Sequence, residues 1–194
     1  MGKKVDIQES LNRLKSGNER FFRDHPLNPH QTYTRRQEVL EGQTPFAAIL
    51  TCSDSRVSPE ILFDQGIGDL FVVRNAGNIV DEMVIASLEY AVMHLNVPLV
   101  VVMGHQMCGA VTAALKGGEA EGHIPDLINK IAPSIHRASG QAGDALTNAI
   151  DANVAQGVEA LRRCEPILAG LYADKQIAIL GAWYDLETGM VIFL

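Results

Sequence analysis

The sequence has no apolar run near the ~20 residues that a membrane helix requires. Its first residues, MGKKVDIQESLNRLKSGNERFF, carry lysines but no apolar stretch behind them, which argues against a secretory signal peptide. The lack of both features argues against a membrane-spanning protein and favours a soluble one. We therefore predict no membrane partner and a cytoplasmic location.

Positive charge is also scarce. The chain has 16 Lys and Arg against 23 Asp and Glu, a formal net charge of -7, and the basic residues are scattered. Proteins that bind nucleic acid in general neutralise its phosphates with clustered Lys and Arg. The charge balance argues against such a protein, so we predict no nucleic-acid partner.

Cysteine is the third scarce feature. The chain has 3 cysteines, Cys52, Cys108 and Cys164, which do not make a disulfide framework. In a reducing compartment, widely spaced Cys and His residues are more typical of metal ligands or of a nucleophile. Cys52 and Cys108 are therefore candidate functional residues. Cys164, in LRRCEP near the end of a predicted helix, is interpreted as a structural thiol.

What the sequence does contain is the pattern of one globular α/β domain spanning 1–194, with 47% hydrophobic and 20% charged residues. The runs PFAAILT, DLFVVR and VPLVVVM are apolar on both faces, which predicts buried parallel strands. Between the last two, residues 78–96 predict a helix whose apolar face comprises Val84, Leu88, Ala91, Val92 and Leu95. This order predicts a mainly parallel β-sheet flanked by helices.

Weaker patterns flank this core. The N-terminal arm, about residues 6–24, is predicted to be a helix whose apolar residues are Leu11, Leu14, Phe21 and Phe22. That face is too narrow for a core helix, so we expect it to pack on another surface such as a partner subunit. Residues 26–45 are predicted to be largely loop with a short helical piece. Further helices are predicted at 108–118 and within 135–172, followed by a strand, a turn and a short last strand in 175–194.

Chemically active residues follow the predicted strands. The three runs lead into Cys52, Arg74 and His105 respectively. Ligands bind at the carboxyl ends of strands in open parallel sheets, so neighbouring strands would bring these ends together. In the extended CSDSR stretch, alternate side chains can share a face, and His105 and Cys108 share one face of a turn.

Two thiolates and an imidazole are a typical zinc ligand set. Three protein ligands with one open position are typical of a catalytic zinc site rather than a structural one. The simpler alternative is that each buried thiol is only a small hydrophobic residue. A phosphate loop in GHQMCGAV is rejected, because Ala110 and Val111 replace its Lys and Ser/Thr. The remaining histidines have no partners at ligand spacing and are interpreted as surface or satisfied residues.

The motifs CSDSR, RNAGN and GHQMCG, in this order, closely resemble the β-class carbonic anhydrases. The resemblance extends from LNRLKSGNERF through PFAAILTCSDSRVSPE, FDQGIGDLFVVRNAGN and SLEYAV to GAWYDLETGMVIFL. Only residues 117–150 carry little of it. A Cys-X-Asp-X-Arg with a distant His-X-X-Cys is far more specific than either half alone.

The resemblance implies that Cys52, His105 and Cys108 bind Zn²⁺, with Asp54 and Arg56 as a carboxylate–guanidinium pair beside the metal. It implies reversible hydration of carbon dioxide to bicarbonate and a proton by zinc-bound hydroxide. Asp54 would accept the hydrogen bond of the hydroxide and so orient the nucleophile, while Arg56 fixes Asp54. It also implies a closed state at low pH in which Asp54 becomes the fourth zinc ligand.

Further implications concern binding and assembly. The resemblance assigns Gly109 to substrate binding and matches Arg74 and Tyr184 to a regulatory bicarbonate site. Ile49 stands where that site would have a tryptophan, so the sequence departs from the family pattern at this position. The implied fold has about four parallel strands plus an antiparallel edge strand. The implied assembly is a homodimer or homotetramer, in which the N-terminal helix embraces a second subunit.

Two alternatives remain open at this point. An enzyme of the same build could hydrolyse carbon disulfide or carbonyl sulfide, because zinc hydroxide can attack these linear molecules too. A non-catalytic protein could instead hold a structural zinc with Asp54 as a permanent fourth ligand. The presence of Arg56 argues against this, since a structural carboxylate ligand needs no competing guanidinium. A thiol redox protein is less favoured, because neither Cys52 nor Cys108 belongs to a Cys-X-X-Cys motif.

Overall fold

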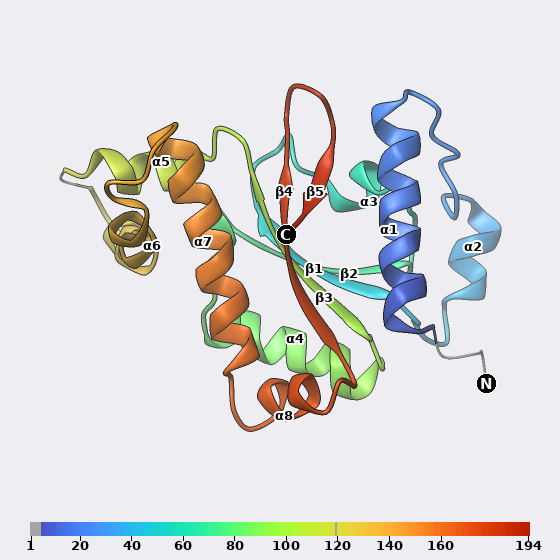
Figure 1. Ribbon diagram of the computed structural model, residues 1–194. Coiled ribbons are helices and arrows are strands. Elements are labelled where there is room, and N and C mark those ends of the chain that lie inside the picture. Colours follow the sequence, from blue (N-terminus) through green and yellow to red (C-terminus); the bar gives the residue numbers. More distant parts are fainter. Residues whose placement is uncertain (1–4, 119) are drawn as a thin grey trace.

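A five-stranded sheet forms the centre of the molecule, with the strand order β2-β1-β3-β4-β5 (Figure 1). The structure is a computed structural model that describes residues 5–118 and 120–194. The parallel strands are β1 (Ala47–Cys52), β2 (Leu70–Asn75), β3 (Leu99–His105) and β4 (Ala178–Tyr184). The last strand, β5 (Val191–Phe193), pairs antiparallel with β4. The predicted α/β fold, with four parallel strands and an antiparallel edge strand, is confirmed.

The apolar runs form strands because helices cover both faces of the sheet. All residues of β1 and β3 are buried, as expected for strands that are apolar on both sides. One face is covered by α4 (Glu82–His94), α7 (Ala145–Arg162) and α8 (Leu168–Ala173). The other is covered by α1 (Ile7–Phe22) and α3 (Pro59–Leu62), with α2 (Tyr33–Glu38) beyond α1. Among the described residues, no helix has the length and apolar composition of a membrane span.

Helix α4 shows how the local pattern determines an element. It begins after Asp81, whose side chain accepts a hydrogen bond from the amide of Val84 at 2.9 Å and so caps the helix. Four of the five predicted apolar residues are buried against the sheet, and Leu95 packs partly buried against the same cluster. The predicted helix and its buried face are therefore confirmed.

Helix α1 corrects the sequence-based interpretation. Leu14 is fully buried in the core of its own chain, so the apolar face is not too narrow for a core helix. Small and polar residues widen the contact: a Cβ at Gly17 would lie 1.8 Å from the carbonyl oxygen of Phe63, and Asn18 is 3% exposed. A count of apolar residues missed these contributions. Packing of α1 on a second subunit stays a prediction.

Two helices, α5 (Gly109–Lys116) and α6 (Ile124–Ala138), pack with α7 around a third apolar cluster that contains Cys52 and Cys108. The first part of α6 and all of α3 were not predicted from the sequence. The apolar spacing of α6 is helical, but Pro133 lies inside the helix and normally signals a break. The short helical piece predicted in 26–45 is confirmed as α2, and the helices predicted in 135–172 include α7 and α8.

Candidate metal centre

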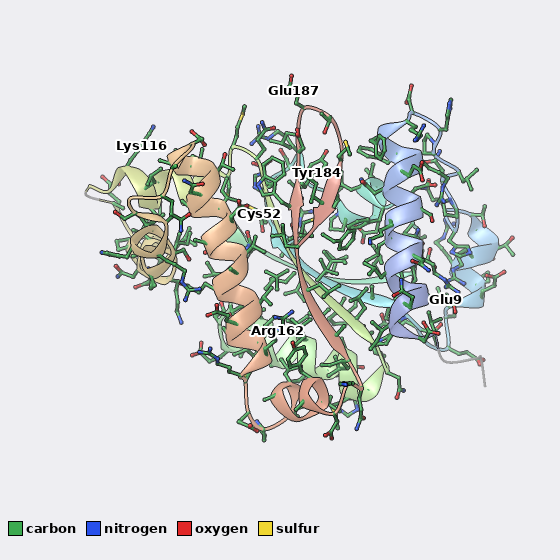
Figure 2. The ribbon with its side chains drawn as sticks, viewed as in Figure 1. Glu9, Cys52, Lys116, Arg162, Tyr184 and Glu187 are labelled. Atoms are coloured by element: carbon green, nitrogen blue, oxygen red, sulfur yellow. The ribbon has the colours of Figure 1, made fainter. Side chains whose placement is uncertain are left out.

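The ends of β1 and β3 lie side by side because these strands are hydrogen-bonded neighbours, with Thr51 opposite Met103. Cys52 is the last residue of β1, His105 is the last residue of β3, and Cys108 is the N-cap residue of α5. Figure 2 labels Cys52 in the half of the sheet nearer the turn that joins β4 and β5. The ligand atoms of the three residues lie within 4.8 Å of one another. The parallel topology thus brings together residues that are far apart in sequence.

The donor atoms of this group fit a metal ion. The sulfurs of Cys52 and Cys108 are 4.0 Å apart and do not form a disulfide. Two sulfurs bound to one zinc ion at ~2.3 Å and the tetrahedral angle would be ~3.8 Å apart. His105 is fully buried, its Nδ1 lies 2.8 Å from the carbonyl oxygen of Gln106, and its Nε2 has no hydrogen-bond partner among the described residues. A cation would satisfy this orphaned nitrogen.

Electrostatics support the same conclusion. The pKa of Cys52 is lowered to about 4 by the thiol of Cys108, by His105 and by the backbone amides of Gly77 and Asp54, against the opposing effect of burial. The pKa of Cys108 is raised by its hydrogen bond with Cys52 and by burial. Two buried thiolates at this distance require a positive ion beside them.

Asp54 and Arg56 form a bidentate pair beside this group. The guanidinium of Arg56 donates from Nε to Asp54 Oδ1 at 2.9 Å and from Nη2 to Oδ2 at 2.7 Å. The hydrogen bonds from Arg56 hold the pKa of Asp54 below its usual range. Asp54 Oδ2 also lies 3.9 Å from Nε2 of His105. The carboxylate is therefore adjacent to the candidate metal centre while Arg56 fixes its orientation.

Arg74 supports the loop that carries Asp54. Its Nε donates to the carbonyl oxygen of Cys52 at 3.2 Å, and its Nη2 donates to that of Asp54 at 2.9 Å. Tyr184 is 5% exposed and packs in the cluster on the α1 face of the sheet (Figure 2). Strands β1 and β3 lie between the strands that carry Arg74 and Tyr184. A shared bicarbonate site at these two residues stays a prediction.

Two glycines adjoin the candidate metal centre, Gly109 after Cys108 and Gly77 beside Cys52. A Cβ at Gly109 would meet no atom within 4 Å, so the start of α5 faces open space, and a substrate role for Gly109 stays a prediction. Gly77 had no predicted role, yet its amide donates to the sulfur of Cys52 at 3.3 Å. The signal for this contact was the glycine in RNAGN, which adopts a φ of 72° that other residues rarely adopt.

Cys164 lies outside this site. It follows α7, packs at the edge of the cluster on the α4 face and forms no disulfide. Burial and the nearby carboxylates of Glu89 and Glu165 raise the pKa of its thiol, so it is a poor nucleophile. The fold and the site together define an α/β protein with a candidate Cys-His-Cys metal centre at the carboxyl ends of a parallel sheet.

Comparison with known proteins identifies the family. Residues 47–191 match the family model described as carbonic anhydrase. The chain is 40% identical over 183 residues to carbonic anhydrase 2 of Mycobacterium tuberculosis. It is 44% identical over 184 residues to the carbonic anhydrase of Mycolicibacterium smegmatis. Each of these two alignments covers 92% of this chain and 88% of the relative.

Solved structures agree with the sequence comparisons. A tetrameric β-carbonic anhydrase from Sordaria macrospora matches with a TM-score of 0.75 and 26% identity, over 95% of this chain and 93% of that one. The Coccomyxa β-carbonic anhydrase in complex with acetazolamide matches with a TM-score of 0.75 and 27% identity, over 96% of this chain and 82% of that one. The chain belongs to the β-class carbonic anhydrase family.

Proposed function

We propose that the protein catalyses the reversible hydration of carbon dioxide to bicarbonate and a proton, with Zn²⁺ as its cofactor. The observation that carries the proposal is the buried group formed by Cys52, His105 and Cys108, whose ligand atoms lie within 4.8 Å of one another. The pair formed by Asp54 and Arg56 lies directly beside it. The reaction is inferred from membership of the carbonic anhydrase family.

Three residues would hold the ion. The hydrogen bond between Nδ1 of His105 and the Gln106 carbonyl requires the proton on Nδ1, which leaves Nε2 as the free lone pair. Cys52 and Cys108 would bind as thiolates, and their two negative charges would balance the charge of the ion. Zinc with three protein ligands and an open position lowers the pKa of a bound water to ~7 and so supplies a nucleophile at neutral pH.

Asp54 would orient the nucleophile. Because Arg56 holds the pKa of Asp54 below its usual range, this carboxylate stays ionised at neutral pH and can only accept hydrogen bonds. It would accept a hydrogen bond from the attacking hydroxyl group and thereby direct an oxygen lone pair at the carbon of CO₂. Arg74 would maintain this geometry through its hydrogen bonds to the carbonyl oxygens of Cys52 and Asp54.

Other roles follow from the family resemblance. Gly109 would border the substrate, which agrees with the open space at its Cα. In a closed state at low pH, Asp54 would leave Arg56 and take the fourth ligand position. Arg74 and Tyr184 would contribute to bicarbonate binding outside the catalytic position.

We also propose a cytoplasmic homodimer or homotetramer built from a single domain. The tetrameric state named for the Sordaria macrospora structures supports an oligomer. Sedimentation equilibrium of the purified protein measures the subunit number directly. A monomer at micromolar concentration would contradict this part of the proposal.

The function is tested by stopped-flow CO₂ hydration on protein of measured zinc content, followed from about pH 6.5 to about pH 9. We expect rapid turnover that rises with pH, because a bound water with a pKa near neutrality must lose its proton to react. Zinc-loaded protein that is inactive across this range would contradict the proposal. Activity toward carbon disulfide or carbonyl sulfide would then identify a sulfur substrate, and inactivity toward all three would identify a structural zinc site.

A further inference from the structure

The turn that follows β2 carries an amide directed at the candidate metal centre. The turn includes the short 3-10 helix η1 (Ala76–Asn78) and is closed by the side chain of Asn75. The amide of Asn75 donates to the carbonyl oxygen of Ile79 and accepts from its N–H, each at 2.9 Å. This closure presents the N–H of Gly77 to the sulfur of Cys52 at 3.3 Å.

A buried asparagine holds the outer side of the same turn. Nδ2 of Asn153, on α7, donates to the carbonyl oxygen of Gly77 at 2.8 Å. Asn153 is 4% exposed and lies among apolar residues of α7. A buried amide is costly unless it is hydrogen-bonded, so an apolar residue would suit packing alone equally well. The asparagine therefore needs an explanation beyond filling the core.

A second buried residue accompanies Asn153. Oγ of Ser134, on α6, is fully buried and lies 3.4 Å from Oδ1 of Asn153 and 3.0 Å from Oε1 of Gln156. Packing restricts the turn further, because a Cβ at Gly77 would lie 2.9 Å from the side chain of Ile131. The turn is thus held by one hydrogen bond from α7 and by close packing against Ile131 of α6.

We infer that Asn153, supported by Ser134, is a positioning residue for the Cys52 thiolate. It holds Gly77 so that the Gly77 N–H donates to the Cys52 sulfur, which withdraws electron density from that ligand and fixes its direction. The inference rests on the proposed metal site but not on the identity of the substrate. Residues behind metal ligands typically change metal affinity by about 10-fold to 100-fold when they are replaced.

The test uses the cobalt-substituted protein, because thiolate-to-cobalt charge-transfer absorption reports the electron density on sulfur. Asn153→Leu and Asn153→Asp both remove the donor to Gly77. We expect both variants to shift this absorption to longer wavelength, because a sulfur that accepts no hydrogen bond gives up an electron more easily. We also expect at least about a 10-fold loss of zinc affinity in competition with a chelator.

Two further variants make the test specific. Asn148→Leu is the matched control: it lies on the same helix, and its Nδ2 donates to the carbonyl of Ala142 rather than to the turn. It should retain the wild-type absorption and zinc affinity. Ser134→Ala removes only a hydroxyl and should shift the absorption in the same direction by less, which keeps the test available if the Asn153 variants do not fold.

The outcomes separate this inference from the proposed function. If the wild-type protein showed no thiolate-to-cobalt absorption, the result would contradict the proposed metal site and with it the proposed function. A wild-type protein that shows this absorption, together with folded Asn153 or Ser134 variants that match it in wavelength and zinc affinity, would overturn only the positioning role. Loss of CO₂ hydration alone, without a change in the absorption, would also count against it.

Discussion

Two buried polar sites in this molecule differ in how completely the chain satisfies them. Beneath α1, Asn18 donates to the carbonyl oxygens of Leu62 and Gly189 and accepts from the amide of Val191, all at 3.1 Å or less. At the strand ends, Nε2 of His105 has no such partner among the described residues, and two thiols face each other at 4.0 Å. The hydrogen bonds of Asn18 stabilise the fold, whereas the unpartnered nitrogen of His105 beside two sulfurs fits a bound cation. The comparison therefore contrasts the structural role of Asn18 with the proposed metal-binding role of His105.

Replacing a candidate metal ligand in the unsatisfied site should have the largest effect. We expect Cys52→Ser and His105→Ala each to lose stoichiometric zinc and to reduce CO₂ hydration to near the uncatalysed rate, because both the ion and its activated water are lost. Zinc is measured by atomic absorption and activity by stopped flow. The control is Cys164→Ser, which alters a thiol outside the site and should retain both. Full zinc in Cys52→Ser would remove this residue from the ligand set.

The next prediction tests the role of the Asp54 carboxylate separately from metal binding. Asp54→Ala should retain zinc and lose about 100-fold to 1000-fold in kcat, because the nucleophile loses its hydrogen-bond acceptor. Asp126→Ala changes an exposed carboxylate at the start of α6 and should have wild-type activity. Normal turnover of Asp54→Ala at alkaline pH would show that the carboxylate does not orient the nucleophile.

The satisfied site should respond in the opposite way. Asn18→Ala leaves two carbonyl oxygens and one amide without partners, so we expect a loss of ~2–4 kcal/mol in the free energy of unfolding. Zinc content per folded molecule should stay at the wild-type value. Urea denaturation followed by circular dichroism measures the loss. Asn12→Ala, which removes only an exposed hydrogen bond from the same helix, should cost much less.

The smallest predicted effect concerns the pH dependence of stability. Asp64 is buried and accepts hydrogen bonds from Arg20 and from the amides of Leu27 and Asn28. Burial acts to raise its pKa, but these hydrogen bonds prevail and lower it. A carboxyl whose pKa is lower in the folded state stabilises the protein above its unfolded pKa of ~3.9, and this contribution disappears as the pH falls through the folded value.

We therefore expect Asp64→Asn to be less stable than the wild type by ~1–2 kcal/mol at pH 7, with a difference that shrinks toward pH 3. The free energy of unfolding of the two proteins is compared in urea across this range. Because Asp64 lies outside the strand-end site, kcat at pH 7 should be unchanged. A stability difference that did not vary with pH would exclude the ionised carboxyl as its origin.

The sequence carried strong signals for the sheet and for the candidate ligands. Apolar runs with β-branched residues marked β1 and β3, and a parallel topology then required that Cys52 and His105 approach each other. The pairing of Asp54 with Arg56 was expected, but the extended conformation predicted for CSDSR is wrong beyond Cys52: Ser55 and Arg56 lie in a turn, in which the amide of Val57 donates to the carbonyl oxygen of Asp54 at 3.0 Å. The correct predictions rest on spacings within one short segment or between neighbouring strands.

Other features could not be read in this way. The depth of α1 in the core depended on Gly17, whose missing side chain allows close contact with the backbone at Phe63. Helix α6 continued through Pro133, because packing against α5 and α7 outweighed the local preference for a break. The burial of a helix and its continuation through a proline depend on which surfaces pack together, and the sequence pattern of one segment does not show this.

The sequence by itself determined the chemical identity of the site: two thiols, an imidazole and a carboxylate next to a guanidinium, each at the end of a predicted strand or just beyond it. Tertiary structure decided how the site is supported. Gly77 and Cys52 are 25 residues apart, so their hydrogen bond exists only after β1 and β2 pair; Asn153 and Gly77 are 76 apart, so theirs exists only after α7 packs on the sheet. The physical reason is that local patterns reflect periodicity, whereas buried polar contacts depend on the close packing of distant segments.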